Sequence, residues 1–348
     1  IISIFSFSLL FLACNSKKDL RVDLHSFSEP HDVVTTHLDL DVEVDFDKEV
    51  ISGVAQYQIE NKNRSRELIL DANGLIIDSV INAGNHCNFI LSKKDSILGQ
   101  ALIIDIEKDT KEVSIFYRSA PGSKALQWLD PRQTAGKKYP FLFTQSQAIL
   151  ARTWIPCQDS PGVRFSYTAK VKVPKGLLAV MSAENPTEKN DEGIYNFKME
   201  QAIPAYLMAL GVGDLMFQAL GEHTGIYAEP EIIGKAAYEF AETEDMLTIA
   251  EEMYGKYAWD RYDILILPPS FPFGGMENPR LTFVTPTILA GDRSLTSLIA
   301  HELAHSWSGN LVTNKTWNDF WLNEGFTVYF ERRIMERLAG REYADMLS

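Results

Sequence analysis

The pattern of apolar and polar residues divides the chain into two parts with different periods. In the first part, short stretches alternate between apolar and polar residues, as a half-buried strand does, and THLDLDVEVDF at Thr36–Phe46 is the clearest example. Further strands are predicted at Val50–Ile59, Glu67–Leu70, Leu75–Ile81, Leu102–Ile106, Glu112–Tyr117, Phe165–Val173, Leu177–Met181, Ile194–Met199 and Tyr206–Val212. Many short strands separated by turn residues predict an antiparallel sandwich or saddle.

The period changes near Pro230, where apolar residues begin to recur at helical spacing. Two short strands are predicted on either side of a loop rich in Pro and Gly, at Asp263–Leu267 and Leu281–Val284. Three helices are predicted at Glu231–Tyr254, Ser294–Ser308 and Trp317–Leu338. Asp292 or Ser294 is expected to begin the second of these helices, and Gly309 to end it.

Length and composition agree with this division. A chain of 348 residues is long enough for about two domains, and its 45% apolar and 23% charged residues are ordinary for a globular protein. We therefore predict a multidomain α+β protein, with an antiparallel all-β domain at 31–221 and a mainly helical domain at 222–348. A net charge of −14 argues against a nucleic-acid partner, because phosphate binding depends on clustered Lys and Arg.

The start of the chain resembles an export signal. Residues 1–13 are an apolar run, too short to span a bilayer, that ends at Cys14. Phe11–Cys14 resembles the lipobox of bacterial lipoproteins, which predicts lipidation of Cys14, a linker over 14–30, and a location in the periplasm or at the outer membrane. A plain secretory signal or a buried strand are the alternatives. Since the chain begins with Ile and lacks a basic segment, we expect residues before it in the natural protein.

Cysteine usage implies no disulfide framework. Apart from Cys14, the chain has Cys87 and Cys157, so a single bridge is possible if the two meet.

The most informative motif is His301-Glu302-Leu303-Ala304-His305. On a helix the two histidines lie one turn apart on the same face, so both imidazoles can reach one metal ion. Glu324, on the next predicted helix, would complete a set of two His and one Glu with an open position for water. Such a set is typical of catalytic rather than structural zinc, and we predict one Zn²⁺ per chain.

The residues around this zinc have predicted roles. Zinc lowers the pKa of a bound water toward neutrality, and Glu302 is placed to act as general base on that water. Glu331 lies two turns beyond Glu324 on the same helical face. It could hydrogen-bond a ligating imidazole, or it could be a solvated helix glutamate.

A second motif precedes the metal motif. In PFGGMENP at residues 272–279, the paired Gly274 and Gly275 would let the backbone approach a bound peptide closely. The carboxylate of Glu277, beside a zinc ion, is suited to hold a free α-amino group. A tight turn without function is the alternative.

These motifs resemble one family. The segments GGMEN at 274–278, the His301–His305 helix, NLVTNKTW at 310–317 and WLNEG at 321–325 are similar to those of the M1 metallopeptidases, the aminopeptidase N-like zinc gluzincins. QSQAILARTWIPCQDSPGVRFSY at 145–167 is similar to the branch of leukotriene-A4 hydrolase and bacterial aminopeptidases. The resemblance extends from about residue 30 to the end of the chain.

The resemblance implies a saddle-like β domain before a thermolysin-like catalytic domain. It implies a zinc aminopeptidase with zinc ligands His301, His305 and Glu324 and with Glu302 as general base. Substrates would be peptides with a free N-terminus. Their binding residues would be Glu277 for the amino group, Gly274 and Gly275 for the backbone, Gln147 from the β domain, and Phe273 and Met276 in the first side-chain pocket.

One element of the family pattern lies beyond this sequence. Family members use a tyrosine well downstream of the third ligand to stabilise the oxyanion, but this chain ends at Ser348, 24 residues after Glu324. We therefore expect the catalytic domain to be truncated at its C-terminal side. Loss of an oxyanion donor costs about 10²–10³ in rate, so the fragment should be weak or inactive. Peptide turnover at the rate of the parent enzyme would contradict this expectation.

Two other functions fit parts of the pattern. A thermolysin-type zinc endopeptidase would use Glu302 in the same way, but a carboxylate at position 277 would obstruct an internal peptide segment. A catalytically silent zinc-bound module that recognises peptides would have no need of the base. Cleavage of an N-acetylated peptide would favour the first alternative, and zinc-dependent turnover would exclude the second.

Overall fold

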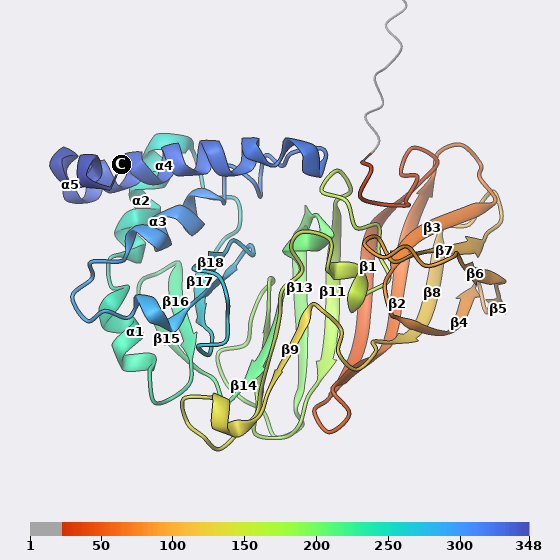
Figure 1. The fold of residues 1–348 in the computed structure, drawn as a ribbon, viewed down its shortest axis with the longest axis horizontal. Coiled ribbons are helices and arrows are strands. Elements are labelled where there is room, and N and C mark those ends of the chain that lie inside the picture. Colours follow the sequence, from red (N-terminus) through yellow and green to blue (C-terminus); the bar gives the residue numbers. More distant parts are fainter. Residues whose placement is uncertain (1–22, 348) are drawn as a thin grey trace, which may run out of the picture.

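The computed structural model describes residues 23–347, which form a β-rich part followed by a part that contains the helices (Figure 1). The β-rich part is built on a seven-stranded sheet. The strands of this sheet, in spatial order, are β13 (Ile194–Ile203), β11 (Phe165–Lys172), β1 (Val33–Asp45), β2 (Val50–Asn61), β8 (Glu112–Arg118), β4 (Ile76–Asn82) and β5 (Asn85–His86).

Two smaller sheets complete this part. One has three strands, in the order β3 (Glu67–Ala72), β7 (Gln100–Asp105) and β6 (Phe89–Leu91). The other has four strands, in the order β12 (Leu178–Met181), β14 (Leu210–Gly213), β10 (Phe141–Thr144) and β9 (Leu126–Leu129).

Side-chain alternation explains these strands. In β1, Leu38, Leu40, Val42 and Val44 are buried, while the residues between them lie on the opposite face of the sheet. Every strand predicted between Thr36 and Met199 overlaps an observed strand. The strand predicted at Tyr206–Val212 is half right, because Ala205–Leu207 forms a 3-10 turn before β14 begins.

The large sheet is not wholly antiparallel. β1 pairs with β2 in antiparallel fashion but with β11 in parallel fashion, from His37 opposite Ser166 to Glu43 opposite Lys172. β1 and β11 are far apart in sequence, so no tight turn imposes an antiparallel pairing on them.

The second part combines a mixed sheet with helices. Its five strands, in spatial order, are β15 (Met216–Ala219), β16 (Thr224–Ala228), β17 (Tyr262–Ile266), β19 (Leu281–Val284) and β18 (Gly275–Met276). Its helices are α1 (Ile233–Glu239), α2 (Thr243–Tyr254), α3 (Ser297–Ala304), α4 (Trp321–Ala339) and α5 (Arg341–Met346). The predicted order of a β domain and a mainly helical domain is confirmed, and the predicted boundary near Gly221 falls in the turn between β15 and β16.

The predicted helices differ from the observed ones at their ends. The long helix over 231–254 is divided into α1 and α2, because the chain turns at Phe240, whose carbonyl accepts from the Thr243 hydroxyl (2.7 Å). The histidine helix is shorter than predicted, since α3 begins after Thr296 rather than at Asp292 or Ser294. The third helix begins at Trp321, after a 3-10 turn at Trp317–Asp319.

The structure answers the prediction for the cysteines but does not include the predicted export signal. Cys87 and Cys157 are both free thiols, and Cys157 is buried in the core, so no bridge joins them. The predicted export signal at 1–13 and lipidation at Cys14 lie outside the described residues. Within the described residues, no helix is both long and apolar enough to cross a bilayer.

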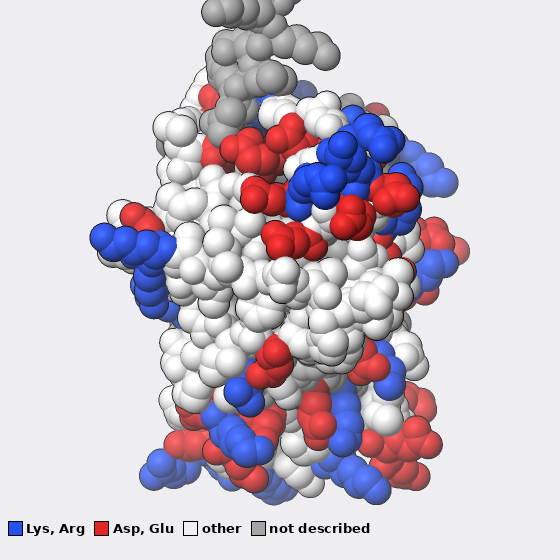
Figure 2. Space-filling view, turned by 90° about the vertical axis from the view of Figure 1, so that its right-hand side faces the viewer, with Lys and Arg blue, Asp and Glu red and all other residues white. Residues whose placement is uncertain are grey.

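Charged side chains are intermixed on the face shown in Figure 2, which looks onto the end of the β-rich part that carries β4, β5 and β6. Lys and Arg lie among Asp and Glu, above and below a central band with few charges, and do not form one basic patch.

A buried arginine joins distant segments of the β-rich part. Arg152 and its partners Asp71 and Asp159 are each at most 1% exposed. The Arg152 Nε donates to Asp159 Oδ2 (2.9 Å), one Nη lies 3.6 Å from Asp71 Oδ1, and the other donates to the carbonyls of His25 (2.7 Å) and Asp159. This group therefore connects β3, the segment that follows Gln147, and the first described residues.

We predict that Arg152→Met lowers the free energy of unfolding by about 3 to 5 kcal/mol, because it leaves two carboxylates buried without their cation. Arg118→Met is the matched control, since Arg118 and its partner Asp78 are both about half exposed. This control should cost about 1 kcal/mol or less. Urea unfolding of both variants measures the difference, and equal losses would contradict the prediction.

Candidate metal centre and peptide cleft

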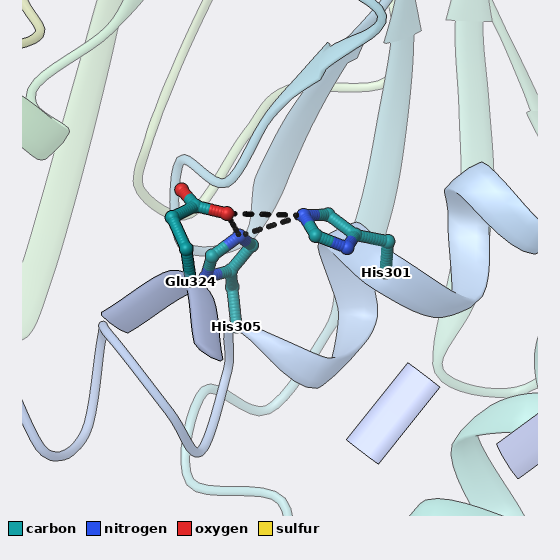
Figure 3. Close-up of side chains that lie close together, drawn as sticks. All are labelled: His301, His305 and Glu324. Atoms are coloured by element: carbon teal, nitrogen blue, oxygen red, sulfur yellow. Dashed lines mark hydrogen bonds and ion pairs between the residues drawn. The ribbon is translucent and has the colours of Figure 1, made fainter. Parts of the chain in front are cut away.

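The two histidines of the motif present their ring nitrogens to one point in space. His301 lies in the last turn of α3 and His305 directly follows that helix, and their Nε2 atoms are 3.2 Å apart. Glu324, in the first turn of α4, places its Oε2 3.5 Å from His301 Nε2 and 3.9 Å from His305 Nε2 (Figure 3). The structure thus brings together the three predicted metal ligands.

Hydrogen bonds at the opposite ring nitrogens define the tautomers. His301 Nδ1 lies 3.1 Å from Glu331 Oε2, and His305 Nδ1 lies 3.1 Å from the Ser308 carbonyl oxygen. Because a carboxylate and a carbonyl oxygen accept hydrogen bonds, each Nδ1 is placed to carry the proton. With a metal bound, each Nε2 would then direct a lone pair at the ion, as a metal-bound imidazole does.

These distances fit a zinc ion. With ligand bonds of about 2.0–2.1 Å, a tetrahedral site has edges of about 3.3–3.4 Å between ligand atoms. The observed separations of 3.2, 3.5 and 3.9 Å lie around that value. Three converging lone pairs repel one another unless a cation lies between them, so the donor set suits a divalent metal.

Glu331 occupies the position that the helical spacing predicted for a hydrogen-bonding partner. It is 7% exposed, so the buried interpretation fits better than that of a solvated helix glutamate. Burial disfavours a charged His301, but hydrogen bonds to Glu324 and Glu331 outweigh it and raise the pKa of His301 to about 10 in the metal-free protein. The carboxylates around His301 therefore stabilise a positive charge at this position.

Glu302 points into the same space from the middle of the motif. Its side chain is 5% exposed, and burial raises its pKa well above the ordinary carboxyl range. His301 opposes this rise in pKa, while Glu277 adds to it. Gly275 makes room for the carboxylate, because a Cβ at that position would lie 2.3 Å from Glu302 Oε1.

Glu277 lies beside the metal ligands and is 4% exposed. One oxygen of its carboxylate, one of Glu302 and a ring nitrogen of His305 lie within 4.8 Å of one another. Gln147 comes from the β-rich part, and its Nε2 donates to Glu277 Oε1 at 3.4 Å. The Glu277 backbone carbonyl accepts from Asn310 Nδ2 at 2.7 Å.

These residues line a cleft of about 410 Å³. Its lining includes the predicted residues Gln147, Phe273, Gly274, Gly275, Glu277, His301, Glu302, His305, Glu324 and Glu331. Phe273 is 51% exposed, and its ring packs edge-on against Phe271 with centroids 5.8 Å apart.

Met276 does not line this cleft as predicted. It is 2% exposed, and its sulfur accepts from Gln145 Nε2 at 3.2 Å. Met276 belongs to the short edge strand β18, in which successive side chains point to opposite faces, so the residue after Gly275 faces the core.

Sequence reasoning missed several residues near the metal ligands. The Thr327 hydroxyl lies 3.1 Å from His305 Nδ1 and 2.9 Å from the Ser308 carbonyl oxygen. Thr327 follows Glu324 by three residues, so the helical spacing that identified Glu331 could have identified it too. Ser297 and Leu298 also line the cleft, and both lie one turn before His301.

Comparison with known proteins agrees with this geometry. The model of the peptidase M1 N-terminal domain matches residues 34–207, and that of the peptidase family M1 domain matches residues 238–347. Leukotriene A-4 hydrolase of Xenopus laevis is 48% identical over 332 residues, which are 92% of this chain and 54% of that protein. Leucine aminopeptidase 2 of Yarrowia lipolytica is 42% identical over 94% of this chain and 51% of that protein.

Solved structures show the same fold. A structure of yeast LTA4 hydrolase in complex with bestatin is 40% identical and superimposes with a TM-score of 0.89, covering 94% of this chain and 52% of that one. The chain belongs to peptidase family M1, whose metallopeptidases are zinc-dependent. It spans about half the length of the relatives it matches.

We predict that Glu331→Gln weakens zinc binding by about 10- to 100-fold, because the ligating His301 loses its charged hydrogen-bond acceptor. Glu336→Gln is the matched control, since Glu336 lies on the same helix and pairs with Arg333 instead. Competition with a chromophoric chelator measures both affinities. If the two variants bind zinc equally well, Glu331 does not support the ligand.

Proposed function

We propose that the protein is a zinc-dependent aminopeptidase that removes N-terminal residues from peptides. The observation that carries this proposal is a buried carboxylate, Glu277, beside the three metal ligands and the Glu302 carboxylate. His301, His305 and Glu324 would hold the ion. When bound, zinc would supply a water of lowered pKa and would polarise the carbonyl of the scissile bond.

Glu302 would transfer protons. Its carboxylate lies inside the cleft near His305, where it can take one proton from the attacking water and deliver it to the leaving nitrogen. The peptide C–N bond breaks as the new C–O bond forms, so a free amino acid and a peptide shortened by one residue result. Burial raises the pKa of Glu302, which strengthens this carboxylate as a base.

Glu277 would determine which peptides are cut. A substrate α-amino group carries a positive charge, and the Glu277 carboxylate with the Gln147 side-chain oxygen offers it acceptors in the cleft. An internal peptide segment has no such charge and would leave the Glu277 carboxylate buried without a counter-charge. This favours an exopeptidase over a thermolysin-type endopeptidase.

A silent peptide-binding module is less well supported. A binder would gain nothing from a buried Glu302 carboxylate directed at the metal ligands, because burying that charge is costly. We propose activity for the whole protein, including any part that follows residue 348.

We predict that Glu277→Gln raises KM for free-amine peptides by about 30-fold or more, because the buried ammonium loses its counter-charge. Zinc content should not change. An N-acetylated peptide of the same sequence is the control substrate for steady-state kinetics. Full affinity of the variant for free-amine peptides would contradict the anchoring role, and equal cleavage of the acetylated peptide would favour an endopeptidase.

Export through a lipidated Cys14 remains part of the proposal, supported by the apolar run before it. Cys14→Ser should move the protein from the membrane fraction to the soluble fraction of a bacterial host, because a lipid chain supplies the attachment. Fractionation with an antibody measures this. A wild-type protein found in the soluble fraction would contradict the proposal.

A further inference from the structure

Arg164 of the β-rich part reaches across to the loop that follows α3. Its Nε and one Nη donate to the Ala202 carbonyl, at 3.0 and 2.8 Å. The same Nη donates to the Asn310 carbonyl at 2.8 Å, and the other Nη donates to the Thr313 hydroxyl. Among the described residues, no ion pair joins this guanidinium to a carboxylate; the side chain is partly buried, and burial lowers its pKa. The guanidinium is held by neutral oxygen acceptors instead, so its position depends on the geometry of these hydrogen bonds.

Asn310 connects that guanidinium to the cleft. It is 1% exposed, and its backbone N–H donates to the carbonyl of the metal ligand His305 at 2.9 Å. Its side-chain Nδ2 donates to the Glu277 backbone carbonyl at 2.7 Å. One residue thus joins the end of α3, the loop of Glu277 and the cation of the β-rich part.

The loop after α3 is closed by backbone hydrogen bonds, from the Gly309 N–H to the Val312 carbonyl (2.9 Å) and from the Val312 N–H to the Trp307 carbonyl (3.2 Å). Thr313 donates its hydroxyl to the Gly309 carbonyl at 2.6 Å while it accepts from Arg164. Leu311 and Val312, between Asn310 and Thr313, are 47% and 74% exposed, so the side chains of the loop tip pack little against the rest of the protein. Arg164 binds the residues on both sides of this exposed tip.

We propose that Arg164 is a positioning residue for the amino group of the substrate. By holding the Asn310 carbonyl, it fixes the Asn310 amide against the Glu277 backbone, and so directs the Glu277 carboxylate toward Gln147 and the cleft. The inference rests on the proposed function, in which Glu277 binds the substrate amino group, because it says which residue supports Glu277. The β-rich part would act on Glu277 twice, through Gln147 at the carboxylate and through Arg164 at the backbone.

Two inhibitors separate this role from a general effect on folding or on zinc. An amino-acid hydroxamate and its des-amino counterpart share the zinc-binding group and the side chain, and they differ in the α-amino group. The ratio of their inhibition constants therefore measures amine recognition in the zinc-loaded, full-length protein. Arg164→Lys keeps the charge but cannot reach all three acceptors at once. Arg118→Lys, at a half-exposed pair, is the matched control.

We expect Arg164→Lys to reduce the preference for the free-amine inhibitor by about 3- to 10-fold, the factor that one net hydrogen bond is worth. Zinc content and affinity for the des-amino inhibitor should stay within about twofold of the wild-type values. In the control variant, the ratio of inhibition constants should also stay within about twofold. Added to Asn310→Ala, which already removes the link to Glu277, Arg164→Lys should have no further effect on the ratio.

An unchanged ratio in Arg164→Lys would overturn the inference, provided that Glu277→Gln abolishes the preference. An unchanged ratio in Glu277→Gln would instead refute the proposed function. If Arg164→Lys fails to fold, Thr313→Val removes one acceptor of the same guanidinium and should lower the ratio in the same direction. Parallel losses of affinity for both inhibitors would show a purely structural role.

Discussion

The convergence of three lone pairs is the constraint on which this site depends. His301, His305 and Glu324 direct ligand atoms at one point, which is unfavourable unless a cation occupies it. On the other side of each ring, Glu331 contacts Nδ1 of His301 and the Ser308 carbonyl contacts Nδ1 of His305, which orients the two imidazoles. α3 and α4 have to pack at one distance and angle for these contacts to form together. Metal binding and the packing of this helix pair are therefore coupled.

The β-rich part contributes to the site as well as preceding it. Gln147 reaches the Glu277 carboxylate, Gln145 contacts the sulfur of Met276, and Arg164 binds the loop after α3. The segment with the two glutamines continues into Arg152, whose buried ion pairs tie it to the rest of the β-rich part. Substitution of Arg152 would thus be expected to shift Gln147 in the cleft, because both residues lie on the same backbone segment.

Local periodicity and spacing predicted much of the fold and most of the metal centre. Alternation identified the strands from Thr36 to Met199, and helical spacing placed His301, His305 and Glu331. Long-range relations were not predictable in this way. The parallel pairing of β1 with β11 and the break between α1 and α2 depend on packing between segments far apart in sequence. Met276 was placed in the cleft by resemblance alone, and the sequence of so short a strand has no alternation that would have shown its side chain facing the core.

The close approach of Gly275 to Glu302 limits which residues the chain can carry beside the candidate metal centre. Any larger residue at 275 would displace the Glu302 carboxylate, because a Cβ there already lies 2.3 Å from its Oε1. Phe273 also lines the cleft but is half exposed, so solvent-facing space is open to a different side chain at that position. The space at residue 273 and the contact at residue 275 therefore set different limits on which side chains these two positions can carry.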